Sequence, residues 1–377
     1  MNKIENPFLV YGYEGPTYFC DRQKETDDVI SALTNGCNLT LMSPRRYGKT
    51  GLIHNVFHRL KEQDKNISCF YVDIYATNTL SDFVRVLGKS VVGKLDTPLQ
   101  KAEGLISKFF RNSQITMSQD PLTGLPQLGL AFNPQQAEQT LEEIFAYLSH
   151  TNRSCFIAID EFQQIAEYPE KNVEALLRTY VQQLHQVHFI FAGSKMHMMS
   201  EMFDSPKHPF YKSTEKLYLD VIREADYYEF AAEKMKEKSI VLSAEAFHQI
   251  YSMVDGVTWF VQSVLNRLYR FEPGVITDVE LRQAVGQIIS TEEENYKRIF
   301  HLLTQNQTQL LKAIAMEGLV KETLSGLFLR THHLKSSSSV QRALQFLTEK
   351  EYVYQTGDGF IVYDRFFGMW LRQRVTV

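Results

Sequence analysis

The sequence lacks the features that mark secreted and membrane-spanning proteins. Only four cysteines occur in 377 residues, and no two of them form a CxxC pair. No apolar run approaches the ~20 residues that a membrane-spanning helix needs, and the N-terminal residues MNKIENPF contain no apolar signal core. We therefore expect a cytoplasmic protein whose cysteines are reduced and packed in its core.

A strong net charge is also lacking. The 40 Lys and Arg residues are nearly balanced by 44 Asp and Glu, which leaves a net charge of -4, so the overall field does not attract nucleic acid or anionic lipid. The GxSxG and HExxH motifs of hydrolases and the Asn/Thr-Lys-x-Asp motif of GTPases are absent from the sequence. These absences argue against the hydrolases that carry these motifs and against a GTPase.

The residues that are present predict an α/β fold. With 44% hydrophobic residues the chain can bury a real core, and its length favours two or three domains. From residue 37 to 220, short apolar runs alternate with longer amphipathic ones, as in parallel strands joined by helices. The expected strands are Asn38–Met42, Ile67–Ile74, Cys155–Ile159, His188–Ala192 and Lys216–Leu219. We expect a P-loop NTPase sheet with helices on both faces.

Composition changes along the chain predict three domains. Residues 1–222 form the α/β domain, within which residues 117–133, rich in Pro and Gly, are an inserted β-hairpin or a surface loop. Residues 223–300 read as a helical lid, in which Thr277-Asp-Val-Glu280 is a capping box. Residues 301–377 predict a winged helix-turn-helix domain.

The winged-helix prediction rests on three expected helices and a tight hairpin. The helices are expected at residues 303–316, 322–331 and 337–349, and the two short strands of the hairpin around residues 357–359. In the third helix the core-facing residues are Val340, Ala343, Leu344 and Leu347. Its outward face carries Ser337, Ser338, Gln341, Arg342 and Gln345.

A phosphate-binding loop follows the first strand. The segment SPRRYGKT (residues 43–50) lies between an apolar strand and an amphipathic helix, the context in which backbone N–H groups and the helix dipole hold phosphate. Lys49 is expected to reach the β- and γ-phosphates of ATP, and the Thr50 hydroxyl to bind Mg²⁺. Ser43 occupies a position that is usually Gly, where positive φ is easily adopted. The expected nucleotide contacts here are Ser43, Pro44, Arg45, Arg46, Tyr47, Gly48, Lys49, Thr50 and Gly51.

Two adjacent carboxylates end the third strand. Asp160 is expected to hold Mg²⁺ through water, and Glu161 to polarise the attacking water, because ligands bind at the carboxyl ends of parallel strands. After the next strand, Ser194 is the first candidate, and Lys195 the second, for a polar group between the water and the γ-phosphate. Asp73, at the end of the second strand, is a candidate for orienting Glu161 or the water.

The two arginines of the loop have open roles. Arg45 and Arg46 would either stabilise transition-state charge, for which Arg46 is the catalytic candidate, or bind the acidic surface of a partner. A solvated basic turn is the third possibility.

Several motifs in fixed order resemble the archaeal-type ATPase family, which is related to AAA+ and STAND ATPases. They are FCDRQKE (19–25), SPRRYGKT, FIAIDEF (156–162), FAGSKMHMM (191–199), PFYK (209–212), SSSSVQRALQFL (336–347) and YDRFFGMWLR (363–372), and they span nearly the whole chain. The resemblance implies an ASCE-type sheet, a helical lid and a winged helix. It also implies that Phe19, Asp21 and Arg22 lie beside adenine. Many relatives contact the nucleotide through a Gly-x-Pro in the lid; the corresponding residues 256–258 here are Gly-Val-Thr.

These features predict an ATPase that acts as a molecular switch, with the winged helix as its output or docking module. The alternative is a regulator that binds ATP with negligible hydrolysis and binds DNA or a partner protein. Residues 301–377 contain nine Lys and Arg against six Asp and Glu, a difference of +3, which is a weak footprint for DNA. A kinase is disfavoured by Glu161, since a kinase binds its acceptor where water would be activated.

Overall fold

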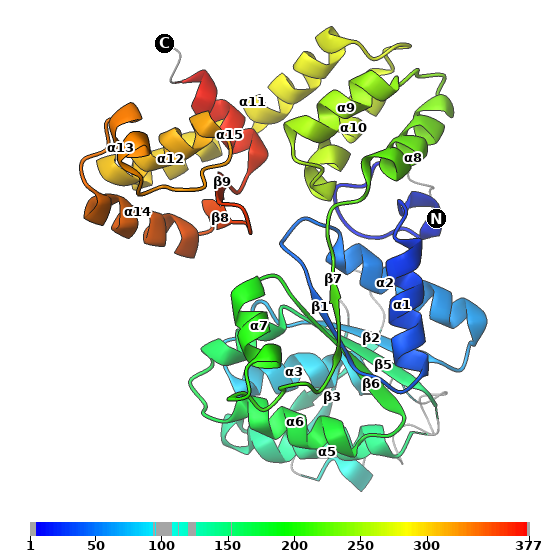
Figure 1. Ribbon diagram of the computed structural model, residues 1–377. Helices are drawn as coiled ribbons and strands as arrows, with labels where there is room; N and C mark the ends of the chain where they lie inside the picture. Colours follow the sequence, from blue (N-terminus) through cyan, green and yellow to red (C-terminus); the bar gives the residue numbers. More distant parts are fainter. Residues whose placement is uncertain are drawn as a thin grey trace. The chain divides into compact units, whose positions relative to one another are not determined.

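The computed structural model describes residues 5–92, 95, 108–111, 113–119, 126–151 and 153–374, coloured along the chain in Figure 1. Two compact units are present. One comprises Tyr11–Ile222, and the other combines Met1–Val10 with Arg223–Val377. Among the described residues, no helix combines the length and the apolar composition that crossing a membrane requires.

The first unit is built on a five-stranded sheet in the order β2-β5-β6-β1-β7, in which every pair of neighbours is parallel. The strands are β1 (Leu39–Met42), β2 (Ser68–Asp73), β5 (Cys155–Asp160), β6 (Val187–Gly193) and β7 (Glu215–Tyr218). All five predicted strands are confirmed with small shifts at their ends. Because β6 separates β1 from β5, the sheet has the ASCE-type arrangement that the family resemblance implies.

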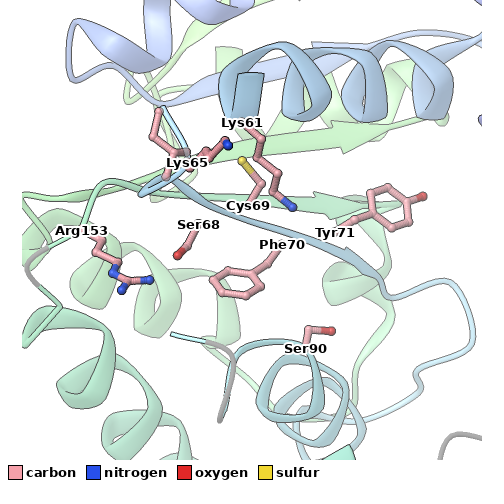
Figure 2. A pocket seen from close by; sticks show the side chains of 9 residues that line it. Lys61, Lys65, Ser68, Cys69, Phe70, Tyr71, Ser90 and Arg153 are labelled. Atoms are coloured by element: carbon pink, nitrogen blue, oxygen red, sulfur yellow. The ribbon is translucent and has the colours of Figure 1, made fainter. Parts of the chain in front are cut away.

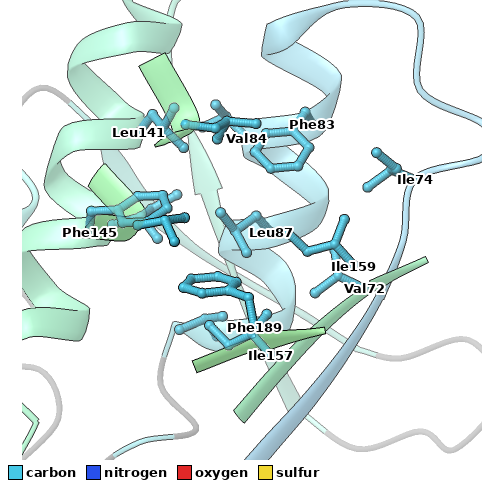
Figure 3. Packing of buried hydrophobic residues seen from close by; sticks show 14 of the residues in the cluster. Val72, Ile74, Phe83, Val84, Leu87, Leu141, Phe145, Ile157, Ile159 and Phe189 are labelled. Carbon is cyan, nitrogen blue, oxygen red and sulfur yellow. The ribbon is translucent and has the colours of Figure 1, made fainter. Parts of the chain in front are cut away.

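Helices cover both faces of this sheet, which explains why the central strand β5 is buried along its whole length and apolar up to Asp160. Phe156 and Ala158 of β5 pack against α1 (Gln23–Thr34) and α2 (Lys49–Gln63) on one face. Ile157 and Ile159 point to the other face, which Figure 3 shows packed with side chains such as Leu87. The helices on that face are α3 (Leu80–Val91), α5 (Ala137–Ser149), α6 (Val173–Gln183) and α7 (Met196–Asp204).

The segment predicted as a hairpin or loop contains two antiparallel strands, β3 (Gln114–Gln119) and β4 (Pro126–Ala131). The first strand begins before residue 117, and residues 120–125 between the strands lie outside the described residues. Leu130 of β4 is buried and packs against the main core of the unit. A Cβ atom added at Gly88 of α3 would lie 2.9 Å from a methyl group of Leu130, so this glycine allows the hairpin to approach the helix closely.

Beyond its N-terminal residues, the second unit is helical and includes a small wing before its last helix. Its helices are α8 (Glu224–Lys236), α9 (Ala244–Met253), α10 (Thr258–Phe271), α11 (Asp278–Leu302), α12 (Gln305–Glu317), α13 (Gly326–Thr331), α14 (Ser337–Glu349) and α15 (Arg365–Gln373). The wing consists of β8 (Val353–Gln355) and β9 (Phe360–Val362). The capping box predicted at Thr277 and Glu280 opens α11, and the predicted core stripe of α14 faces inward, with Leu344 half-buried.

Residues 5–10 belong to this second unit, although the sequence placed them with the α/β domain. Phe8 is fully buried, and its ring meets those of Phe230 and Tyr269 edge-on. The Asn266 side chain donates a hydrogen bond to the Phe8 carbonyl oxygen at 2.7 Å. Burial of this aromatic ring among helices of the second unit explains the difference.

The helical and winged-helix segments pack on each other within the second unit. Phe366 of α15 lies edge-to-face on Phe260 of α10, with ring centroids 5.3 Å apart. The Arg365 guanidinium forms an ion pair with Asp255 at 2.6 Å. The boundary expected between residues 300 and 301 falls inside α11, which continues without a break from the lid segment to the winged-helix segment.

Candidate functional site

The loop between β1 and α2 crosses the carboxyl edge of the sheet. Ser43 is fully buried, and its backbone N–H donates to the Gly193 carbonyl oxygen at 3.2 Å. The left-handed φ angles of the loop occur at Arg46 (72°) and Gly48 (95°), and Ser43 is not among the positive-φ residues. Serine therefore fits the position where glycine is usual, because the backbone conformation there does not require glycine.

The first turn of α2 meets the end of β5 through charged groups. The Lys49 ammonium donates to Asp160 Oδ1 and lies 3.3 Å from Glu161 Oε1. The Thr50 hydroxyl donates to Asp160 Oδ2 at 3.2 Å. Lys49 and Asp160 are both buried, so their opposite charges interact with little screening by water.

Glu161 is held by two neutral donors on its other oxygen. Ser194, after β6, and Gln163 each donate to Glu161 Oε2 at 2.6 Å. Glu161 itself has a left-handed φ of 57°, an uncommon conformation for a residue other than glycine, asparagine or aspartate. The backbone is thus strained at Glu161, the predicted general base.

The pKa values of Asp160 and Asp73 are shifted in opposite directions. Burial alone would raise the pKa of Asp160, but the charge of Lys49 and the hydrogen bonds from Lys49 and Tyr71 outweigh burial and hold the pKa below its ordinary value. Asp73 is the register partner of Asp160 on the neighbouring strand. Partial burial, together with the charges of Asp160 and Glu161, raises the pKa of Asp73, although its hydrogen bond from the Tyr75 N–H at 2.9 Å opposes this.

The N-terminal motif lies beside the phosphate loop. The Arg22 guanidinium is buried, donates to the carbonyl oxygens of Tyr47 and Asp220, and pairs with Glu25 at 2.7 Å. Phe19 covers the start of α2, since a Cβ atom added at Gly51 would lie 3.2 Å from its ring. Arg22 thereby holds the phosphate loop through the Tyr47 carbonyl oxygen. Contact of Phe19, Asp21 and Arg22 with adenine stays a prediction.

Three other predicted residues, Lys195, Arg45 and Pro44, have contacts away from the two carboxylates. The Lys195 ammonium pairs with Glu167 at 2.6 Å, which leaves Ser194 as the residue after β6 that contacts Glu161. Arg45 places its guanidinium 5.2 Å from the centre of the Tyr75 ring. Pro44 accepts a hydrogen bond from the Ser43 hydroxyl at 3.0 Å.

Two residues of the site were missed from the sequence. Tyr71 of β2 donates its hydroxyl hydrogen to Asp160 Oδ2 at 2.6 Å, and Gln163 holds Glu161. Tyr71 stands two residues before Asp73, so strand alternation places both side chains on one face; that spacing was an available signal. For Gln163 the only sequence signal was its position two residues after Glu161. Its side chain has room to reach Glu161 because residue 193 is glycine: a Cβ atom added there would lie 2.4 Å from Gln163 Oε1.

The oxygen atoms at this edge suit magnesium. Thr50 and Asp160 present a hydroxyl and a carboxylate oxygen 3.2 Å apart. Mg²⁺ is usually held by one or two protein oxygens together with water and phosphate, so a larger ligand cluster is not required. Within the described part of the chain, no three His, Cys, Asp or Glu side chains gather as a metal-ligand set.

A phosphate loop at one strand end, with a buried lysine beside two carboxylates on a nearby strand, defines a P-loop nucleotide-binding protein. Comparison with family models identifies the family. The model described as "ATPase domain predominantly from Archaea" matches residues 19–264, and one described as "Probable winged helix domain" matches residues 294–373. The chain belongs to this ATPase family and carries a winged helix domain at its C-terminus.

Solved structures share the fold over nearly the full chain. The Walker-type ATPase PABY2304 of Pyrococcus abyssi aligns with a TM-score of 0.67 at 14% identity, covering 97% of this chain and 99% of that protein. The ORC2 protein of Aeropyrum pernix, solved as ADPNP–ADP complexes, aligns at 0.58 with 14% identity and coverage of 99% and 98%. The ORC1 protein of the same organism, solved in complex with DNA, aligns at 0.56 with 13% identity and coverage of 97% and 95%. No curated protein matches the chain.

Proposed function

We propose that this protein hydrolyses ATP in the presence of Mg²⁺ and uses the reaction to switch its second unit between states. One observation supports hydrolysis more than any other. Glu161, at the end of β5, is held by Ser194 and Gln163 on one oxygen while its other oxygen lies beside Lys49. A carboxylate oriented in this way beside a phosphate loop is suited to accept a proton from water.

The roles of the side chains follow from their positions. Lys49 contacts the β- and γ-phosphates, and backbone N–H groups of the loop surround them. Mg²⁺, bound by the Thr50 hydroxyl and through water by Asp160, would neutralise charge on the phosphates. Glu161 accepts the proton of the attacking water, and Ser194 keeps the Glu161 carboxylate in place.

Lys49 also links nucleotide binding to the readiness of Glu161. In the structure its ammonium pairs with Asp160 and lies 3.3 Å from Glu161 Oε1. We propose that phosphates draw the ammonium toward themselves, which leaves Glu161 Oε1 available to water. Glu161 Oε2 remains held by Ser194 and Gln163, so the carboxylate does not rotate away.

Lys49→Ala tests the nucleotide site. The substitution removes two charge-assisted hydrogen bonds from the Lys49 ammonium to the phosphates, each worth about 1.5–3 kcal/mol. The ATP affinity should therefore fall at least about 100-fold. Isothermal titration calorimetry measures the affinity, and Lys61→Ala, at the exposed end of the same helix, is the matched control. An unchanged affinity in the folded Lys49→Ala protein removes the site from this loop.

The switch proposal rests on the construction of the second unit. The chain passes between the units near residues 10 and 222, and the lid and winged-helix segments form one compact unit. A change in the lid on nucleotide binding would therefore carry the winged helix with it. The output would be a partner protein or DNA, reached through exposed residues of α14 such as Gln341, Arg342 and Gln345.

The alternative is a regulator that binds ATP with negligible turnover and binds DNA. Two observations support this alternative: α14 has an exposed polar face, and one relative was solved in complex with DNA. Phosphate release measured with and without duplex DNA separates the two. Steady release that stops in the Lys49→Ala variant supports the ATPase; tight ATP binding without release, together with ATP-dependent DNA binding, supports the regulator.

A further inference from the structure

A cavity of about 460 Å³ lies beside β2, away from the phosphate loop. Figure 2 shows it between the end of α2, the strand β2 and the end of α3. Its lining includes residues 67–71 of the strand, Lys61 and Lys65 from the end of α2 and the turn after it, Ser90 from α3 and Arg153 from the approach to β5. The nucleotide site and the comparisons assign no role to this cavity.

The cavity runs along the outer edge of the sheet. Consecutive side chains of a strand point to opposite faces, and both sets line the cavity: Cys69 and Tyr71 on the α2 side, Ser68 and Phe70 on the α3 side. Because side chains from both faces of β2 line the cavity, the cavity follows the edge of this strand. The lined stretch of five residues is about 16 Å long at ~3.3 Å per residue.

This edge presents backbone groups for pairing. In the sheet order of the described residues, β2 is terminal, with β5 as its neighbour. The Ser68 N–H donates to the carbonyl oxygen of Ser154, the residue before β5, at 3.0 Å, and the Ile74 N–H donates to that of Asp160 in β5 at 3.2 Å. Because alternate residues of a parallel strand bond to the same neighbour, the N–H and C=O groups of Cys69 and Tyr71 face away from β5, toward the cavity.

The charge of the lining is positive although the chain as a whole is acidic. Lys61, Lys65 and Arg153 line the cavity, and its described lining contains no Asp or Glu. Within the described residues, no ion pair engages Lys61 or Lys65, and both are exposed. A concentration of positive charge on a chain with a net charge of -4 selects for a partner that carries carboxylates or phosphates.

The position of the helix ends favours a peptide over a small anion. Both α2 and α3 direct their C-terminal ends to the cavity, with Lys61 and Ser90 in the last turns. Helix C-terminal ends carry partial negative charge and repel a lone phosphate. A peptide strand avoids this conflict because its backbone pairs with β2 while its acidic side chains reach the cations.

We propose that the outer edge of β2 binds an acidic, extended peptide segment of a partner protein as an added strand. Backbone hydrogen bonds to Cys69 and Tyr71 supply the affinity, as in other cases of strand addition. Carboxylates on the segment meet Lys61, Lys65 and Arg153 and select acidic partners. This surface is separate from the winged helix, so the chain would hold a partner through its ATPase unit.

Fluorescence anisotropy tests the proposal with a labelled peptide of alternating glutamate and valine, six residues long. The full-length protein should bind it, and Lys61→Glu/Lys65→Glu should weaken binding more than tenfold. Lys171→Glu/Lys207→Glu changes the net charge equally at exposed sites elsewhere in the same unit and should leave binding unchanged. Lys61→Gln/Lys65→Gln serves as a milder second variant if charge reversal impairs folding.

A second peptide separates strand addition from simple charge attraction. The same sequence with N-methyl groups on alternate residues keeps its carboxylates but loses the hydrogen-bonding edge, so it should bind at least tenfold more weakly. Equal binding of the two peptides would overturn strand addition. Equal effects of the two charge-reversal pairs, or the absence of binding at millimolar peptide, would overturn the site itself.

Discussion

Asp160 and Glu161 are neighbours in the chain but are held by different groups. Asp160 accepts hydrogen bonds from Lys49, Thr50 and Tyr71, a setting that stabilises its charged form. Glu161 is turned by its left-handed backbone toward Ser194. At the residue scale, this divergence supports the proposed roles, in which Asp160 holds the metal and Glu161 activates water.

Asp73 is expected to reduce stability at neutral pH. Its pKa is raised by partial burial and by the two nearby carboxylates, so its contribution to stability is complete below its unfolded pKa of about 4 and is lost as pH rises through the folded pKa. Asp73→Asn keeps the acceptor for Tyr75 and removes the titration. Thermal unfolding should show the variant to be more stable than wild type at pH 8, with the difference narrowing toward pH 4. A difference that does not change with pH contradicts the raised pKa.

Ser194 and Lys195 are expected to differ sharply in their effect on turnover. Ser194→Ala removes the hydrogen bond that holds Glu161, a bond to a charged group worth about 1.5–3 kcal/mol, which corresponds to a roughly 10–100-fold loss in kcat. Lys195→Ala removes a surface pair with Glu167 and should change kcat less than about twofold. ATP affinity should stay close to wild type in both. A larger loss in Lys195→Ala reverses the assignment.

At the scale of elements, the strand order brings the site together. The phosphate loop follows β1, Asp160 is the last residue of β5 with Glu161 directly after it, and Ser194 follows β6, which lies between β1 and β5. Each strand ends at the same edge because all are parallel, so short polar segments far apart in sequence meet there. The position of β2 beside β5 adds Tyr71 and Asp73 to the same group.

Local sequence patterns were sufficient for the strands, the phosphate loop and the two carboxylates. Each of these is a contiguous segment whose composition is tied to its own geometry, as in the apolar run of β5 followed by Asp160 and Glu161. Contacts set by strand register were not visible: the hydroxyl of Tyr71 reaches Asp160 only because β2 pairs with β5. The choice between Ser194 and Lys195 likewise depended on Glu167, which lies on a different element.

At the scale of the whole molecule, the chain forms two compact units, and the second contains both the segment predicted as a lid and the winged helix domain. The lid and winged-helix segments share α11 and pack through Phe260 and Phe366. Both tryptophans of the chain, Trp259 and Trp370, lie in this unit. Their fluorescence therefore reports on the second unit alone.

Phe366→Ala is expected to destabilise the second unit by about 3–5 kcal/mol, as is typical for a buried phenylalanine. Urea unfolding followed by tryptophan fluorescence measures the change, and the exposed Leu327→Ala should lie within about 0.5 kcal/mol of wild type. Trp259→Phe and Trp370→Phe proteins should unfold at the same urea concentration. Separate transitions for the two tryptophans would show that lid and winged helix fold as independent domains.

The role of Glu161 as the general base is tested by the rate of ATP hydrolysis in the Glu161→Gln protein. Glutamine keeps the shape of the side chain but cannot accept the proton of water, and a general base contributes roughly 100–10,000-fold to a rate. The Glu161→Gln protein should bind ATP with nearly wild-type affinity, and its single-turnover hydrolysis should be slowed at least about 100-fold. The Glu167→Gln protein should retain wild-type hydrolysis. Hydrolysis at the wild-type rate in Glu161→Gln would show that Glu161 is not the general base.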